Sequence, residues 1–115
     1  MRKILVATIL VAGSVRAQDS AGNAEAGKRL YMKNGCYQCH GTVGQGTIAG
    51  LRIDPPPLSA QGLIGYVRRP AGQMPAFSEK VMSDRELTDV YAFLKTIPPP
   101  KPSKDIPLLN DLRGK

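Results

Sequence analysis

The pentapeptide Cys36-Tyr37-Gln38-Cys39-His40 constrains this chain more than any other part of its sequence. Two cysteines three positions apart, with a histidine directly after the second, form the pattern of covalent c-type haem attachment. The two thiols add across the two vinyl groups of one porphyrin, so their separation has to match the macrocycle. His40 is then held under the ring, where an imidazole nitrogen binds iron as an axial ligand. The motif predicts one haem c, bound covalently by Cys36 and Cys39.

Three other kinds of site use a pair of cysteines. In an exported chain the pair is often a disulfide. A thioredoxin-like redox motif needs a βαβ context, and the sequence has no strand pattern. A structural zinc site needs four ligands, whereas the chain has two cysteines and one histidine in total. Because all three fall within five positions, haem is favoured, and a disulfide-stapled exported domain without haem is the alternative.

The first seventeen residues are expected to be a signal peptide. Arg2 and Lys3 give a basic start, residues 4–12 are apolar and uncharged, and Val15-Arg16-Ala17 offers a small residue at a cleavage point. The apolar run is too short to span a bilayer, which takes about 20 residues. An uncleaved anchor is the alternative. We expect a periplasmic protein with no membrane span after cleavage, which agrees with haem attachment outside the cytoplasmic membrane.

The length of 115 residues predicts one domain. We expect a signal peptide at 1–17, the haem domain at 18–100 and a proline-containing tail at 101–115. Removal of Arg2, Lys3 and Arg16 with the signal leaves 13 basic against 9 acidic residues, a formal charge of +4. This modest charge predicts docking to an acidic partner surface, and no aromatic-basic patch indicates nucleic acid. A mature chain this small needs the porphyrin in its core, so we expect the haem-free chain to be poorly folded.

Helices are the expected elements, at residues 24–34, 60–69 and 84–95. Asn23 and Ser59 are positioned to cap the first two, and Gly35 and Pro70 to end them. Ser83-Asp84-Arg85-Glu86 is a capping box that begins the last helix. The period of about 3.6 residues predicts its buried face. That face comprises Leu87, Val90, Tyr91 and Leu94.

The segments between the helices are irregular in sequence. Residues 41–46 hold three glycines and are expected to pass close to the porphyrin edge. Pro55-Pro56-Pro57 excludes a helix over 48–58 and favours extended backbone. Four polar residues are candidates for hydrogen bonds to the haem propionates, the alternative for each being a solvated side chain. They are Arg52, Tyr66, Arg68 and Arg69.

A second axial ligand has to come from a residue other than histidine, since His40 stands alone. Met74 lies in a loop and is followed by Pro75, and a methionine thioether opposite histidine raises the potential of haem iron. Met32 lies in the helix before the motif and therefore on the wrong side. Met82 precedes the last helix, where a methionine is usually a core filler. Met74 is the predicted ligand, and an open sixth site is the alternative.

With these motifs in place, the chain resembles the class I cytochromes c, particularly small bacterial periplasmic ones. The resemblance spans about residues 23 to 97. It is carried by Gly27 and Tyr31, by residues 35–41, by Met74-Pro75 and by the helix around Leu87 to Leu94. It implies an all-α cytochrome c fold of three to five short helices around one haem. It also implies that the first and last helices cross at right angles, with Gly27 and Tyr31 meeting the Tyr91 region.

One departure from the family pattern concerns His40. Family members commonly carry a Gly-Pro pair whose proline carbonyl accepts a hydrogen bond from the second ring nitrogen of the histidine. This chain has Gly50-Leu51 in the comparable stretch. The Leu51 carbonyl is a possible acceptor in a less rigid loop, and the sequence leaves the partner of His40 open.

The resemblance implies electron transfer by Fe(III)/Fe(II) cycling, without enzymatic activity of the chain's own. The expected partners are redox proteins: a dehydrogenase, a respiratory complex or an oxidase. The chain is then either a diffusing carrier or the cytochrome subunit of a periplasmic dehydrogenase, and the proline-rich tail, as a docking strap, favours the subunit. The alternative is a haem-based sensor or peroxidase-like protein, from which Met74 would have to dissociate.

Overall fold

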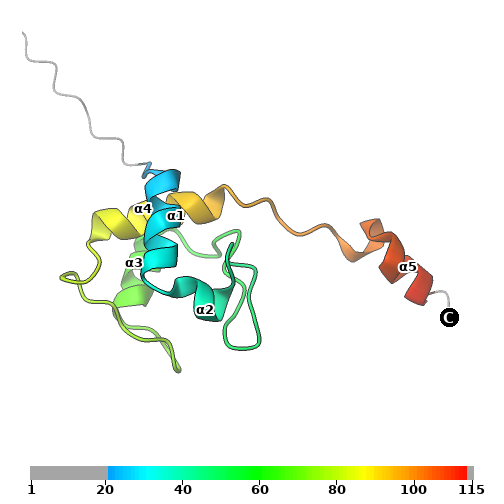
Figure 1. Ribbon diagram of the computed structural model, residues 1–115, viewed down its shortest axis with the longest axis horizontal. Coiled ribbons are helices and arrows are strands. Elements are labelled where there is room, and N and C mark those ends of the chain that lie inside the picture. The colour runs from blue at the N-terminus through cyan, green and yellow to red at the C-terminus, as the bar shows by residue number, and fades with distance from the viewer. Residues whose placement is uncertain (1–20, 114–115) are drawn as a thin grey trace, which may run out of the picture.

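The structure is a computed structural model that describes residues 21–113 (Figure 1). The expected signal peptide lies outside these residues. The helices are α1 (Ala24–Lys33), α2 (Cys36–His40), α3 (Ala60–Arg68), α4 (Asp84–Lys95), the 3₁₀ helix η1 (Ser103–Asp105) and α5 (Pro107–Arg113). Within residues 21–113, β-pairing is limited to one isolated bridge between Thr47 and Gly50. The prediction of an all-α fold is confirmed.

The first and last helices of the haem domain, α1 and α4, pack against each other through their backbones. A Cβ atom added at Gly27 would lie 1.8 Å from the carbonyl oxygen of Asp89 and 2.8 Å from the nitrogen of Val90. Such distances are far inside van der Waals contact, so only glycine permits this approach. The resemblance had implied a close contact of the two helices at Gly27, and the structure confirms it.

Gly27 and Tyr31 meet the region around Tyr91, as expected, and the aromatic partner of Tyr31 within it is Phe93. Tyr31 is completely buried, and its ring centroid lies 5.5 Å from that of Phe93 in a tilted arrangement. The buried residues Val90, Phe93 and Leu94 share one face of α4. Tyr91 turns partly away from that face, is half-buried, and has the Lys95 amino group 5.7 Å from its ring centroid.

The predicted helix caps are present. The side chains of Asn23 and Ser59 accept hydrogen bonds from the nitrogens of Ala26 and Gly62, at 2.9 and 3.1 Å. At α4, the Ser83 side chain accepts from the Glu86 nitrogen while the Glu86 carboxylate accepts from the Ser83 nitrogen. These hydrogen bonds satisfy backbone donors that a helix start leaves free.

The glycine loop at residues 41–46 has a different neighbour from the one expected. None of its residues belongs to the described lining of the large cavity discussed below. Instead, the Gly44 carbonyl accepts from the nitrogens of Ile53 and Asp54, and a Cβ at Gly44 would lie 2.9 Å from the Leu94 side chain. The loop needs glycine to pass over the end of α4.

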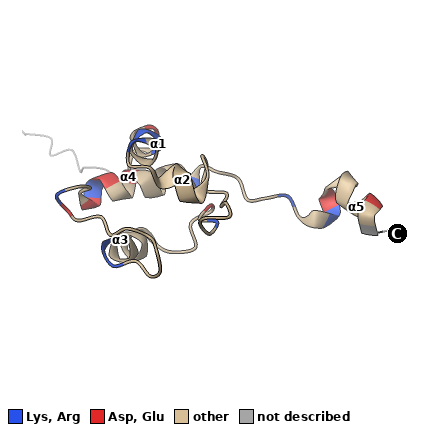
Figure 2. Cartoon of the chain, turned by 60° about the horizontal axis from the view of Figure 1, so that its bottom comes forward, with Lys and Arg blue, Asp and Glu red and all other residues tan. Residues whose placement is uncertain are grey.

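The C-terminal segment extends away from the four helices of the haem domain (Figures 1 and 2). Among the described helices, α5 contacts only η1. The side chains of Leu108 and Leu112 in α5 are 70% and 63% exposed. The segment thus forms a short helix that does not pack on the core. No helix within residues 21–113 has the length and apolar character to cross a membrane.

Candidate haem-binding site

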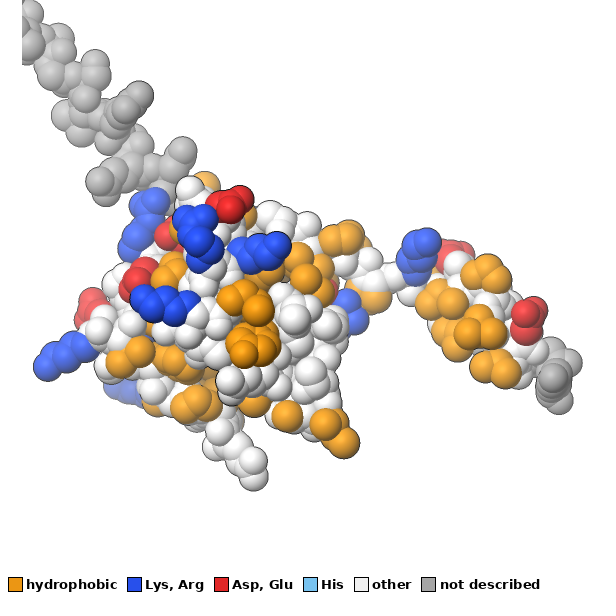
Figure 3. All heavy atoms as spheres, viewed as in Figure 1, with side chains coloured by type: hydrophobic (Ala, Val, Ile, Leu, Met, Phe, Trp, Pro, Cys, Tyr) orange, Lys and Arg blue, Asp and Glu red, His pale blue; other side chains and the backbone are white. Residues whose placement is uncertain are grey.

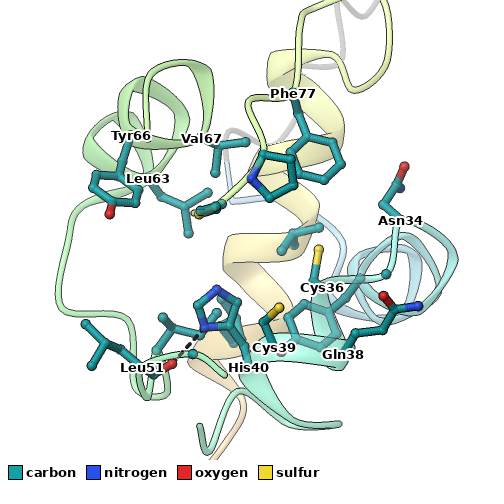
Figure 4. Close-up of a pocket in the computed structure, with 18 of the residues that line it drawn as sticks. Asn34, Cys36, Gln38, Cys39, His40, Leu51, Leu63, Tyr66, Val67 and Phe77 are labelled. Atoms are coloured by element: carbon teal, nitrogen blue, oxygen red, sulfur yellow. Dashed lines mark hydrogen bonds between the residues drawn. The ribbon is translucent and has the colours of Figure 1, made fainter. Parts of the chain in front are cut away.

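A cavity of about 860 Å³ opens between α2, α3, α4 and the loops that join them. Figure 4 shows Cys36, Cys39 and His40 on α2 facing Leu63, Tyr66 and Val67 of α3 across this space. Figure 2 shows the same arrangement at the scale of helices, with α3 on one side and α1, α2 and α4 on the other. Core residues of α4 also line the cavity, so it adjoins the hydrophobic core.

The motif forms a single helical turn with glycine at both ends. Gly35 precedes α2 with φ 76° and Gly41 follows it with φ 78°, values that favour glycine. The buried Tyr31 hydroxyl donates a hydrogen bond to the Gly41 carbonyl at 2.6 Å, which fixes the end of α2 to α1. The Thr47 hydroxyl donates to the Cys39 carbonyl at 2.5 Å. The two cysteines and His40 are therefore held on one short, anchored segment.

The ring of His40 is oriented by the Leu51 carbonyl. Its Nδ1 atom lies 2.7 Å from that oxygen, the dashed line in Figure 4. A carbonyl oxygen only accepts, so Nδ1 carries the hydrogen, and in the neutral ring Nε2 then has its lone pair for another ligand. The partner that the sequence left open is thus the leucine carbonyl.

The two thiols are free in the structure and border the cavity. Burial raises the pKa of the Cys36 thiol, which keeps this thiol uncharged at neutral pH. Within residues 21–113, no group of three or more histidine, cysteine or acidic side chains is arranged to hold a metal ion. The described residues therefore do not form a zinc site.

Met74 lines the same cavity as Cys36, Cys39 and His40. Its loop is attached to α3, because the Phe77 nitrogen donates to the Val67 carbonyl at 3.1 Å and Arg68 donates to the Phe77 carbonyl at 2.8 Å. A second guanidinium nitrogen of Arg68 contacts the Asp84 carboxylate at 2.5 Å, where α4 begins.

The other two methionines of the described chain differ from Met74 in position. Met82 is 1% exposed and belongs to the hydrophobic core, although one side of it also borders the cavity. Met32 is exposed on α1 and lies outside the cavity lining. The positions of both agree with the sequence expectation.

The candidate propionate-binding residues divide into two groups. Arg52 and Tyr66 line the cavity. Arg68 does not, since its guanidinium is engaged by Phe77 and Asp84, and Arg69 is exposed outside the lining. Of the four candidates, Arg52 and Tyr66 therefore border the cavity, whereas the Arg68 guanidinium joins α3 to the methionine loop and to α4.

Asp54 is a feature that sequence reasoning missed. Its side chain is 1% exposed and lies 3.0 Å from an Arg52 guanidinium nitrogen, while its Oδ1 atom has no hydrogen-bond partner among the described residues. The sequence feature that could have revealed this ion pair is the placement of Arg52 two residues before Asp54, directly before three prolines. Buried carboxylates are rare unless they are paired, so an acidic residue there indicated a structural ion pair.

The residues that line the cavity fit a covalently bound haem. They supply two thiols three positions apart, an imidazole with a free Nε2, a thioether, and predominantly apolar walls around a space of about 860 Å³. Cavities that bind organic cofactors have this character, a mostly apolar lining with a few convergent polar groups. Imidazole and thioether are ligands of haem iron in electron-transfer proteins.

Comparison with known families assigns the fold. A family model described as "Cytochrome C oxidase, cbb3-type, subunit III" matches residues 22–94, which comprise α1, α2, α3, α4 up to Leu94 and the whole described cavity lining. Searches of curated proteins and of solved structures gave no significant match. The match covers well over half of the chain, and with it come a covalently bound haem c and haem-based electron transfer. The chain therefore belongs to the cytochrome c family.

Proposed function

We propose that the chain is a periplasmic electron-transfer protein in which His40 and Met74 bind the haem iron from opposite sides. The observation that carries this proposal is the orientation of His40. Its Nδ1 atom is engaged by Leu51 at 2.7 Å, so Nε2 is the ring nitrogen left to bind iron. Met74 supplies a soft thioether on the same cavity.

The bound haem supplies one-electron exchange between Fe(III) and Fe(II). The chain's own residues bind and shield it. Cys36 and Cys39 would hold it by two thioether bonds, and the apolar side chains of α3 and α4 that line the cavity would keep water from it. With a histidine and a methionine fixed by separate elements, little of the chain has to rearrange when the charge of the site changes. This is why we propose an electron carrier rather than an enzyme.

The surface provides a basis for docking. Exposed Lys28 and Lys33 lie on α1, and Figure 3 shows basic side chains gathered over that part of the molecule. Ile48 and Leu51, which border the cavity, are fully or largely exposed. An apolar rim at the cavity and a set of basic residues on α1 suit brief contact with an acidic redox partner.

Two versions of the function differ in whether the partner is permanent. The family model is named after an oxidase subunit, which makes an oxidase one candidate partner class beside respiratory complexes and dehydrogenases. The extended tail with exposed Leu108 and Leu112 favours the version in which the chain is the cytochrome subunit of a periplasmic dehydrogenase. Co-purification of a second protein at stoichiometric yield distinguishes the subunit from a diffusing carrier.

The deciding experiment is an optical spectrum of the exported, haem-loaded protein, oxidised and reduced, for the wild type and Met74→Ala. We expect a low-spin c-type spectrum with the weak far-red sulfur-to-iron band, and loss of that band in the variant. Met82→Leu is the control, since Met82 also borders the cavity but belongs to the core. It should keep the band.

Other outcomes would redirect the proposal. A high-spin wild type that binds carbon monoxide rapidly would show an open sixth site, and would favour a haem-based sensor or peroxidase-like protein. A band lost in Met82→Leu and kept in Met74→Ala would make Met82 the ligand. An N-terminal sequence of the exported protein that begins close to residue 18 would support signal cleavage and the periplasmic location.

A further inference from the structure

The carbonyl that orients His40 belongs to a residue with no anchor of its own. The Leu51 side chain borders the cavity and does not belong to the hydrophobic core, and among the described residues no hydrogen bond uses the Leu51 N–H. No hydrogen bond from the leucine's own N–H therefore helps to hold its carbonyl 2.7 Å from Nδ1 of His40. Its position has to be fixed by the residues on either side.

On the N-terminal side, the backbone is held by Gly50. The Gly50 carbonyl accepts from the Thr47 nitrogen at 2.9 Å, and a Cβ at Gly50 would lie 2.7 Å from the Cys39 carbonyl oxygen. This segment is therefore pressed against the haem-attachment turn. The Gly50 contacts fix the position of the backbone before Leu51. They do not fix the orientation of the peptide between Leu51 and Arg52, which carries the Leu51 carbonyl.

On the C-terminal side, Arg52 and Asp54 close a clasp around the backbone. The Arg52 guanidinium donates from Nε to the Asp54 carbonyl at 2.9 Å and from Nη2 to the Asp54 carboxylate at 3.0 Å. The Asp54 side chain is buried, and its backbone nitrogen donates to the Gly44 carbonyl at 3.2 Å. A planar guanidinium that makes two hydrogen bonds fixes direction as well as distance.

We propose that the Arg52–Asp54 clasp is a positioning device that holds the Leu51 carbonyl on His40 and thereby sets the electron density of the haem ligand. It replaces, with a side-chain ion pair, the stiffness that a proline at position 51 would give to the backbone. A histidine whose second ring nitrogen donates to a well-placed acceptor is a more basic ligand. A more basic ligand stabilises ferric iron, so loosening the clasp raises the reduction potential.

This proposal rests on His40 ligation. It predicts that loss of Arg52 shifts the reduction potential in the opposite direction from a purely electrostatic role of Arg52. Arg52 lines the cavity, so its positive charge by itself disfavours the ferric state. Arg52→Lys keeps the positive charge but loses the planar guanidinium that makes two hydrogen bonds to Asp54. It therefore separates the effect of the charge from the effect of the clasp. Under the clasp proposal the potential of Arg52→Lys rises. If Arg52 acts only through its charge, the potential stays the same.

The single histidine of the chain gives a direct probe of the hydrogen bond. In the haem-loaded ferrous protein labelled with ¹⁵N-histidine, the only histidine ring signals come from His40. We expect the Nδ1 hydrogen to exchange with solvent about fivefold faster in Arg52→Lys than in the wild type, the effect of weakening one hydrogen bond. Asp54→Ala, which removes the carboxylate that accepts from Nη2 of Arg52, should have a similar effect, and the double variant should be no faster than the worse single variant.

Arg69→Lys is the matched control, because Arg69 is exposed and lies outside the cavity lining. It should change neither the exchange rate nor the potential. If Arg52→Lys keeps the wild-type exchange rate and potential, the clasp proposal is overturned. The far-red band serves as a separate readout. If the wild type and Arg52→Lys both show it, the proposed His40/Met74 ligation stands whichever result the clasp experiment gives.

Discussion

At the scale of single residues, the α1–α4 contact depends on Gly27 having no side chain. The two backbones are so close that any side chain at this position would meet the peptide between Asp89 and Val90. Backbone atoms cannot move aside as a flexible side chain can. The helices would have to separate, and the packing of Tyr31 on Phe93 would loosen with them.

Gly27→Ala should therefore destabilise the haem-loaded protein by about 3 kcal/mol, measured by denaturant unfolding. Gly65→Ala in α3 is the matched control, since a Cβ at Gly65 meets nothing within 4 Å. That substitution should stabilise the protein by about 0.5–1 kcal/mol through helix propensity. Equal effects of the two substitutions would contradict the packing argument.

A second residue-scale prediction concerns Tyr31 and alkaline pH. Burial, foremost, raises the pKa of the Tyr31 hydroxyl well above its ordinary value, so the folded state keeps the phenol neutral where the unfolded chain ionises it. The stabilisation is complete below the unfolded pKa of about 10 and is lost as pH rises above it. Stability followed by circular dichroism should fall with increasing pH from about 10 upward.

Tyr31→Phe should remove this part of the pH dependence. It should also cost about 1 kcal/mol at neutral pH, because the hydrogen bond to the Gly41 carbonyl is lost. Tyr37→Phe, at an exposed position of α2, controls for the effect of removing a tyrosine hydroxyl. An alkaline transition that is identical in wild type and Tyr31→Phe would show that another group governs it.

At the scale of elements, α3 and the start of α4 together hold the loop that carries Met74. Arg68, in the last turn of α3, donates to the Phe77 carbonyl and contacts Asp84 in the first turn of α4. One half-buried guanidinium thus joins two helices and the loop between them. A fixed loop keeps the thioether in reach of the cavity, so the lifetime of the proposed iron–sulfur bond depends on Arg68.

Arg68→Ala should weaken that bond without removing the ligand. We expect the far-red band to disappear at a lower temperature than in the wild type, and carbon monoxide binding to the reduced protein to be about tenfold faster or more, since the variant loses a charge-assisted hydrogen bond of about 1.5–3 kcal/mol. Arg69→Ala, one residue further along and exposed, should behave as wild type. An unchanged band and an unchanged rate in Arg68→Ala would refute the role.

At the scale of the whole molecule, the hydrophobic core and the haem cavity share residues. Leu87, Val90 and Leu94 belong to the core cluster and also line the cavity. The apolar face of α4 is therefore buried partly by α1 and partly by the cofactor. A domain of this size has little other apolar surface to bury.

The haem-free chain, prepared by expression without haem attachment, should accordingly have reduced helicity and a broad thermal transition. Far-UV circular dichroism of the haem-free and haem-loaded proteins under the same conditions tests this. Native-like helicity with cooperative unfolding in the haem-free chain would show that α1 and α4 suffice for a stable core.

Local sequence determined much of this protein. The spacing of Cys36, Cys39 and His40 specifies the cofactor because thioether chemistry fixes the distance between the thiols. The caps at Asn23, Ser59 and Ser83 specify where helices start, because each satisfies backbone donors within the next three residues. Such features depend on neighbours in the chain, so the sequence alone carries them.

Tertiary structure decided the choices among chemically similar residues. Phe93 and Tyr91 are both aromatic residues of α4, and the way α1 packs on α4 brings Phe93 to Tyr31. By sequence, Arg52 and Arg68 were equal candidates for hydrogen bonds to the haem propionates. In the folded chain Arg52 pairs with buried Asp54, and Arg68 pairs with Phe77 and Asp84. These outcomes depend on long-range backbone placement, which is set by the summed packing of many side chains and which no short motif encodes.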